Sequence, residues 1–202
     1  MKAEQQMKTM VIFNHPYQGS YCAAVREAVV SGLKRANAEI DVLNLDQDGF
    51  NPVMSTEELA GFSQGIASDP KVLDYQARIA DADHLVFIFP IWWELMPALT
   101  KGFMDKVLLK GFAYDEVGPP PRFVSRLPKV KSVTLITTMT IPQAIYRFYF
   151  GNAIKKAFFT GGFRKIGIKR TKWISLPSVK SVSQEKREKW LADIENRFAQ
   201  LT

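Results

Sequence analysis

Cysteine and histidine are scarce in this sequence, and their scarcity excludes two kinds of site. Cys22 is the only cysteine among the 202 residues, so an intrachain disulfide cannot form. His15 and His84 are the only histidines, and together with Cys22 they are too few for a zinc cluster. We therefore expect no metal site, and the low cysteine usage is typical of a reducing compartment.

Long apolar runs are also missing. No segment approaches the ~20 consecutive apolar residues of a membrane-spanning helix, and residues 1–14 carry polar side chains where a signal peptide has a continuous apolar stretch. With 47% apolar and 23% charged residues, the chain still has enough apolar surface to bury a core. We expect one globular domain over residues 1–202, located in the cytoplasm and without membrane association.

Negative charge is absent from one long stretch of the chain. Residues 122–180 contain thirteen Lys and Arg residues and no Asp or Glu, whereas residues 1–121 contain ten basic and sixteen acidic residues. Such a stretch attracts anions. It suits a solvated face, a phosphorylated cofactor, an anionic membrane surface or a nucleic acid. Because the aromatic residues beside its basic pairs fit a core or an interface better than a base-stacking surface, we expect no nucleic-acid partner.

Short β-rich runs alternate with segments of helical periodicity. The predicted strands are 7–13, 40–45, 85–89, 130–138 and 171–176. The predicted helices are 20–36, a short helix from 55, 69–83, 97–109, 141–159 and 183–201, while Gly118 and the three prolines after it predict a surface loop. This alternation predicts an α/β three-layer sandwich with a five-stranded parallel sheet of order 2-1-3-4-5.

In that strand order, ligands bind at the carboxyl ends of the strands, where the winding direction reverses. The loops that meet there are 14–20, 90–97 and 138–143. The first loop leads into a helix whose N-terminal N–H groups at Ser20 and Tyr21 can bind a phosphate, assisted by the His15 ring. An equally good interpretation makes Ser20 an ordinary N-cap and His15 a turn residue. Neither GxGxxG nor GxxxxGK[ST] occurs, which disfavours the common dinucleotide fold and the P-loop.

The second loop contains two adjacent tryptophans, Trp92 and Trp93, between Pro90 and Pro97. Consecutive side chains cannot all face one core, so a flat aromatic ligand is a better partner for these rings than core packing alone. Backbone N–H groups between the two prolines are candidates to bond the polar edge of such a ligand. Packing in the core or at a dimer interface remains an alternative for one of the two rings.

The order and spacing of several short motifs resemble those of the flavodoxin-like NAD(P)H:quinone oxidoreductases. The matching segments are Asn14-His15-Pro16, Ser20-Tyr21, Asn51-Pro52-Val53-Met54, Pro90-Ile91-Trp92-Trp93, the run Pro97 to Val107, and Gly111-Phe112-Ala113-Tyr114. The resemblance extends over about residues 8–115 and recurs at Thr137-Thr138.

The resemblance implies a flavodoxin-like sandwich that binds FMN or FAD. It places the flavin phosphate at His15, Ser20 and Tyr21. It places the isoalloxazine ring against a second set of residues, Pro90, Ile91, Trp92 and Trp93, with further contacts from Thr137, Thr138 and Met139. It also implies a homodimer with the sites at the subunit interface, NAD(P)H as co-substrate and a quinone-like acceptor. FMN is preferred because the chain lacks the long C-terminal extension of the larger FAD-binding relatives.

The chain departs from the family beyond residue 138. Met139-Thr140-Ile141-Pro142 stands where the family has a glycine-rich turn, and Phe150 stands where better-studied members have a histidine that steadies charge on the reduced flavin. Phenylalanine cannot donate a hydrogen bond, so Tyr146, Arg147 or backbone N–H groups must supply that stabilisation. Tyr146 is the candidate catalytic residue.

These observations predict an FMN-dependent NAD(P)H:quinone oxidoreductase that transfers a hydride in a two-electron, ping-pong reaction. Two alternatives remain. A flavodoxin-type electron carrier shares the fold, although such carriers are usually acidic and residues 122–180 are basic. An ancillary regulatory subunit of a membrane transporter is the other, because some family members have that role.

Overall fold

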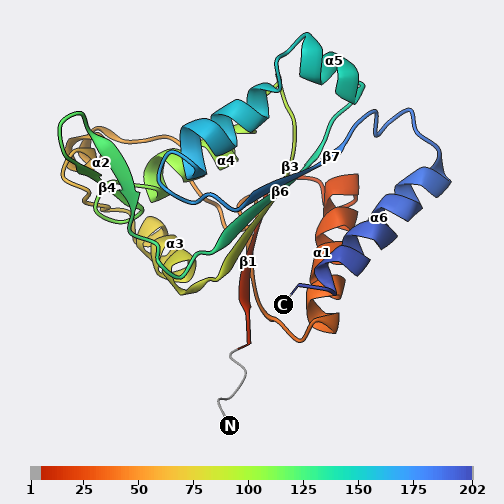
Figure 1. Cartoon of the computed structure of the whole chain (residues 1–202), viewed down its shortest axis with the longest axis horizontal. Coiled ribbons are helices and arrows are strands. Elements are labelled where there is room, and N and C mark those ends of the chain that lie inside the picture. Colours follow the sequence, from red (N-terminus) through yellow and green to blue (C-terminus); the bar gives the residue numbers. More distant parts are fainter. Residues whose placement is uncertain (1–5, 202) are drawn as a thin grey trace.

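The computed structural model describes residues 6–201, so residues 1–5 and 202 of the expected domain lie outside the described part. Its centre is a five-stranded parallel sheet of order β2-β1-β3-β6-β7 (Figure 1). The strands are β1 (Lys8–Phe13), β2 (Glu39–Asn44), β3 (His84–Pro90), β6 (Ser132–Thr138) and β7 (Thr171–Leu176). Once the separate hairpin strands β4 and β5 are set aside, this is the predicted order 2-1-3-4-5.

The sheet lies between two layers of helices (Figure 1). On one face lie α1 (Tyr21–Arg35) and α6 (Gln184–Phe198), and on the other lie α3 (Pro70–Asp81) and α4 (Ala98–Val107). All seven residues of β3 are buried, as expected for a central parallel strand covered on both sides. Helices α1 and α6 approach closely at Gly32, where an added Cβ would collide with the backbone oxygen of Glu195.

The short helix α2 (Thr56–Phe62) begins with the expected cap. Ser55 accepts a hydrogen bond from the N–H of Glu58, and the Glu58 side chain accepts one from the N–H of Ser55. The carboxylate of Glu58 also pairs with Lys106 of α4 at 2.7 Å. The sequence signal for this helix start is therefore confirmed.

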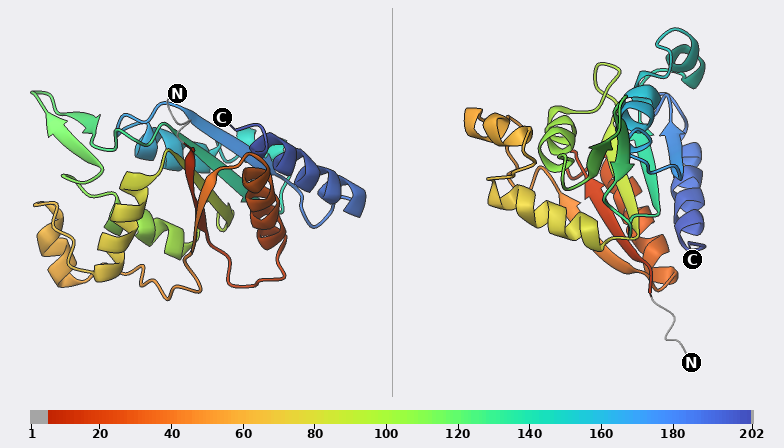
Figure 2. Two further views of the ribbon diagram at one scale, coloured as in Figure 1. Left: turned by 90° about the horizontal axis from the view of Figure 1, so that it is seen from below. Right: turned by 60° about the vertical axis from the view of Figure 1, so that its left-hand side comes forward.

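Two predictions about the chain after residue 110 were incomplete. The region of the proline loop forms a β-hairpin of β4 (Tyr114–Val117) and β5 (Arg122–Ser125), which projects beyond the main sheet in the left-hand view of Figure 2. The expected helix 141–159 is interrupted, because Gly151 and Asn152 both have positive φ. It becomes the short helix α5 (Gln143–Phe148) followed by the π-helix η1 (Lys155–Phe163). None of the helices within residues 6–201 combines the length and the apolar composition of a membrane-spanning segment.

Candidate functional site

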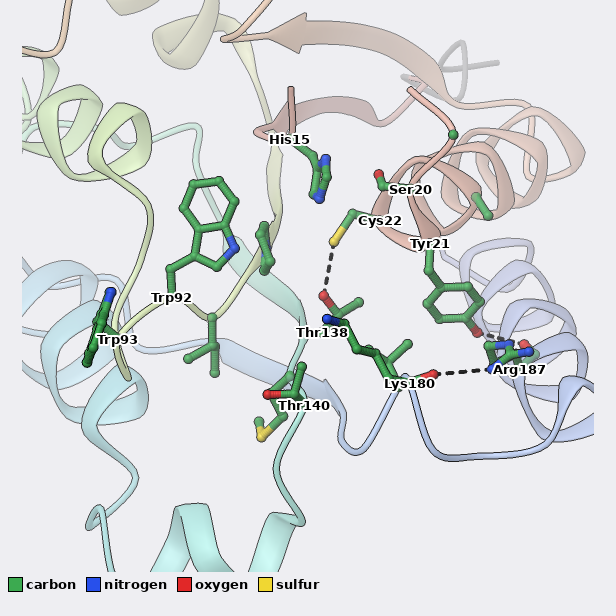
Figure 3. A pocket seen from close by; sticks show the side chains of 16 residues that line it. His15, Ser20, Tyr21, Cys22, Trp92, Trp93, Thr138, Thr140, Lys180 and Arg187 are labelled. Atoms are coloured by element: carbon green, nitrogen blue, oxygen red, sulfur yellow. Dashed lines mark hydrogen bonds between the residues drawn. The ribbon is translucent and has the colours of Figure 1, made fainter. Parts of the chain in front are cut away.

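A cavity of about 860 Å³ opens at the carboxyl ends of β1, β3 and β6, where the strand order predicted a ligand site (Figure 3). Its volume is in the range of small-molecule and cofactor pockets. The residues that line it are His15, Gly19, Ser20, Tyr21, Cys22, Ala24, Pro90, Ile91, Trp92, Trp93, Thr138, Met139, Thr140, Val179, Lys180 and Arg187. The structure thus brings the three predicted loops together, along with the segment between β7 and α6.

The N-terminus of α1 forms one end of this cavity. Ser20 is its N-cap, and the Ser20 hydroxyl accepts a hydrogen bond from the N–H of Ala23 at 3.1 Å. The first turn contains no acidic residue. The first carbonyl of the helix to accept, that of Ser20, bonds to the N–H groups of Ala23 and Ala24, so the N–H groups of Tyr21 and Cys22 have no acceptor within the helix. Ser20 is therefore an ordinary cap that also stands at a site suited to an anion.

Two basic residues border the same end of the cavity, and neither was predicted from the sequence as a site residue. Lys180 follows β7, and Arg187 lies in the first turn of α6. The Arg187 guanidinium donates hydrogen bonds to the backbone oxygens of Val179 and Val182, which fixes it beside Lys180. The only indication in the sequence was the absence of Asp and Glu from residues 122–180, a stretch that includes Lys180. Arg187 lies beyond that stretch, so no pattern in the sequence indicated its role.

Tyr21 connects the α1 end of the cavity to α6. Its hydroxyl donates a hydrogen bond of 2.6 Å to the backbone oxygen of Arg187. Partial burial raises the pKa of Tyr21 to about 12, so this hydroxyl is neutral and remains a donor at neutral pH. The bond holds Arg187 next to the start of α1.

The opposite side of the cavity is aromatic. Trp92 is 45% exposed, and its ring centroid lies 6.3 Å from that of His15, with the two planes inclined at 63°. Trp93 is 98% exposed and lies at the outer edge of the cavity, beyond Trp92 (Figure 3). The two tryptophans therefore have different environments, and only Trp92 lies beside the first loop.

The backbone of this loop offers fewer donors than expected. The N–H of Ile91 bonds to the backbone oxygen of Thr138 at 2.8 Å, and the N–H groups of Trp92 and Leu95 each bond to the other residue's carbonyl across a tight turn. Three of the backbone donors between Pro90 and Pro97 are consequently occupied. The expectation that these groups face a ligand is wrong for Ile91, Trp92 and Leu95.

The loop after β6 contributes Thr138, Met139 and Thr140 but not Thr137. The Thr138 hydroxyl lies 3.2 Å from the sulfur of Cys22, whose pKa burial raises to about 11. Thr137 is fully buried on the other face of the sheet, where its hydroxyl accepts a hydrogen bond from the indole of Trp173. Thr137 is thus a core residue and was wrongly predicted as a cofactor contact.

Tyr146 also lies outside the cavity. It is fully buried, its hydroxyl donates to the backbone oxygen of Glu94 at 2.7 Å, and it accepts a hydrogen bond from the N–H of Ile154 at 2.8 Å. Burial raises the pKa of Tyr146 to about 12. With its hydroxyl enclosed in this way, Tyr146 cannot touch a substrate, and the catalytic role predicted for it is corrected.

Among residues 6–201, no group of three or more His, Cys, Asp and Glu side chains is arranged to hold a metal ion.

The chain is similar in sequence and in fold to several known proteins. A mouse ribosyldihydronicotinamide dehydrogenase [quinone] is 28% identical over 127 residues, which cover 55% of each chain. The crystal structure of Smu.1420 from Streptococcus mutans superposes with a TM-score of 0.86 at 28% identity, covering 96% of this chain and all of that one. An FMN-dependent NADH-azoreductase from Bacillus anthracis, in complex with FMN, has the same fold at a TM-score of 0.76 and 15% identity, covering 96% of this chain and 99% of that one.

The match to the curated relatives is partial, and the match to the family is nearly complete. The chain spans about half the length of the curated relatives it matches. The model of the family described as having the flavodoxin-like fold matches residues 7–200. This protein therefore belongs to the flavodoxin-like fold family.

Proposed function

We propose that the protein binds FMN in this cavity and acts as an NAD(P)H:quinone oxidoreductase. One observation carries the proposal. The capped N-terminus of α1, with Lys180 and Arg187 beside it, lies across a single cavity from Trp92 and Pro90. An anion site and an aromatic surface in one pocket match a ligand that has a phosphate at one end and a flat ring at the other.

The residues at the α1 end fit the phosphate. The N–H groups of Tyr21 and Cys22 and the hydroxyl of Ser20 are donors, while Lys180 and Arg187 supply positive charge. The Tyr21–Arg187 bond keeps these groups together before a ligand arrives, which lowers the cost of ordering the site.

The residues at the other end fit a planar ring. Pro90, Ile91 and Met139 give apolar surface, and Trp92 gives an aromatic face next to His15. When bound, FMN would supply the redox chemistry by accepting a hydride from NAD(P)H and passing it on to an acceptor. The chain holds and orients the ring, and no residue is required as a nucleophile. A dehydrogenase [quinone] among the relatives supports a quinone-like acceptor.

Donor and acceptor would bind one after the other at the same open side of the cavity. Trp92 and Trp93 line the cavity. Since both substrates need the same face of the ring, the reaction is expected to show ping-pong kinetics.

The protein is also proposed to form a homodimer with the cavity at the interface. Large apolar side chains are exposed on the turn that lines the cavity and at the end of α5: Trp93 at 98%, Phe148 at 78% and Tyr149 at 80%. They belong to two neighbouring segments, because the Trp92–Leu95 turn is bonded to α5 through Tyr146. An exposed apolar patch of this kind is typical of a protein interface, and a second copy would cover it.

Sedimentation equilibrium tests the dimer. The double variant Trp93→Ser/Phe148→Ser should shift the dimer toward monomer, with an association constant lowered by about 100-fold. As a control, Leu59→Ser/Ile66→Ser removes two exposed apolar side chains near α2 and should leave association unchanged. A wild-type monomer at all concentrations, or equal effects of the two double variants, would disprove this interface.

The flavin content of the purified protein tests the function. The protein is expected to be yellow, or to become so with added FMN, and acid should release FMN. It should then oxidise NADH or NADPH with a soluble quinone as acceptor. A protein that neither contains nor binds FMN or FAD would refute the proposal. A protein that binds FMN without turnover would instead support an electron carrier.

A further inference from the structure

The turn that carries the two tryptophans is conformationally strained. Trp92 and Leu95 pair through reciprocal backbone bonds of 3.0 and 3.1 Å, and the two residues between them turn the chain. Trp93 has φ +47° and Glu94 has φ +65°. Turns of this type favour Asn and Gly because other L residues resist positive φ. Two bulky residues therefore need an external contact that keeps them in this conformation.

Tyr146 provides that contact from outside the cavity. Its buried hydroxyl bonds to the backbone oxygen of Glu94, the second of the two strained residues, and accepts the N–H of Ile154. A single hydroxyl thus joins the turn after β3 to the chain that follows α5. The backbone of Tyr146 is fixed as well, because its carbonyl accepts the N–H of Asn152. The hydrogen bond from Tyr146 to Glu94 therefore connects a fixed side chain to a strained turn.

We infer that Tyr146 is a positioning residue, whose hydroxyl holds the Trp93–Glu94 turn in its strained form and so keeps Trp92 against the flavin ring. The inference rests on the proposed function of the cavity. Trp92 adjoins the strained pair and bonds across it to Leu95, so relaxation of the turn moves the Trp92 ring. Because Tyr146 does not line the cavity, it acts on the reaction only through the position of the Trp92 ring.

Tyr146→Phe tests this role because it removes only the hydroxyl. The variant should bind FMN about tenfold more weakly and show a raised KM for the quinone. Tyr75→Phe is a matched control. Tyr75 is equally buried, its hydroxyl bonds to Asp48, and neither of these two residues lines the cavity. Both variants should lose a similar amount of stability, but Tyr75→Phe should bind FMN as the wild type does.

A second substitution separates positioning from a general loss of packing. Glycine at residue 94 accepts positive φ without strain, so the turn of Glu94→Gly needs no clamp. In the background of Glu94→Gly, the further change Tyr146→Phe should weaken FMN binding by less than twofold. FMN affinity is measured by the quenching of flavin fluorescence, and stability by urea unfolding.

Three outcomes decide the inference. The inference is supported if Tyr146→Phe lowers FMN affinity about tenfold and this loss of affinity disappears in the Glu94→Gly background. Unchanged FMN affinity in Tyr146→Phe overturns it, as does the same tenfold loss with and without the Glu94→Gly substitution. These results require that the wild-type protein binds FMN, and a wild type that does not bind refutes the proposed function instead.

Discussion

Replacing Ser20 with Asp should weaken FMN binding by about 100-fold and leave the fold nearly as stable as before. Ser20 caps α1 by accepting the N–H of Ala23, and aspartate is as good an N-cap as serine. The first turn of α1 carries no acidic residue, so the new carboxylate meets no like charge in that turn. Its effect is therefore confined to an anion bound at the helix N-terminus.

The magnitude follows from the distance. A phosphate on the first-turn N–H groups would lie roughly 4 Å from the new carboxylate, where two unit charges repel by about 1 kcal/mol in water and about 4 kcal/mol at an effective dielectric constant of 20. The cavity opens to solvent and also contains Lys180 and Arg187, so an intermediate value applies. About 2.7 kcal/mol corresponds to about 100-fold in Kd.

Titration with FMN and with riboflavin, followed by flavin fluorescence, measures this effect. Riboflavin lacks the phosphate, so Ser20→Asp should change its affinity little. Ser55→Asp is the control, because Ser55 makes the same cap at α2 and lies outside the cavity. The reasoning fails if Ser20→Asp leaves FMN affinity unchanged, or if it weakens riboflavin as much as FMN.

Two further predictions concern the aromatic side of the cavity and the core. Trp92→Ala should lower turnover by about tenfold and cost little stability, because the side chain is 45% exposed; a large loss in urea unfolding with normal turnover would make Trp92 a core residue. Burial lowers the pKa of His84 from 6.5 to about 4, so the unfolded chain takes up a proton at a higher pH than the folded protein does. The neutral, buried His84 therefore contributes fully to stability above pH 6.5, and this contribution is lost as the pH falls toward 4. The free energy of unfolding should fall by about 3 kcal/mol between pH 7 and pH 4, and by less in His84→Asn. Urea unfolding measures both values, and equal acid sensitivity of the two proteins would count against this role.

The sheet and the place of the cavity were predictable because they depend on local patterns. Strands such as 85–89 are continuous apolar runs, and helices such as α2 begin at capping residues. Together with the right-handed crossover rule, these patterns leave few topologies. The topology in turn identifies the loops at the carboxyl ends of β1, β3 and β6, and the cavity lies there.

The predictions for individual site residues failed where the orientation of a side chain, or its contact with a distant part of the chain, determines whether it reaches the cavity. Thr137 and Thr138 are neighbours on one strand, so their side chains face opposite sides of the sheet, and only Thr138 faces the cavity. Which of the two does so depends on the register of β6. Tyr146 lies in a short helix whose buried side is set by packing against distant residues. Arg187 reaches the cavity only because α6 packs on α1.

A crystal structure of the protein with FMN would show whether this cavity is the flavin site and which of its ends holds the phosphate. We expect the phosphate within hydrogen-bond distance of Ser20 and the N–H of Tyr21, with Lys180 and Arg187 beside it, and the isoalloxazine ring against Trp92. A flavin bound elsewhere, or one bound in this cavity with its phosphate directed away from α1, would contradict this expectation.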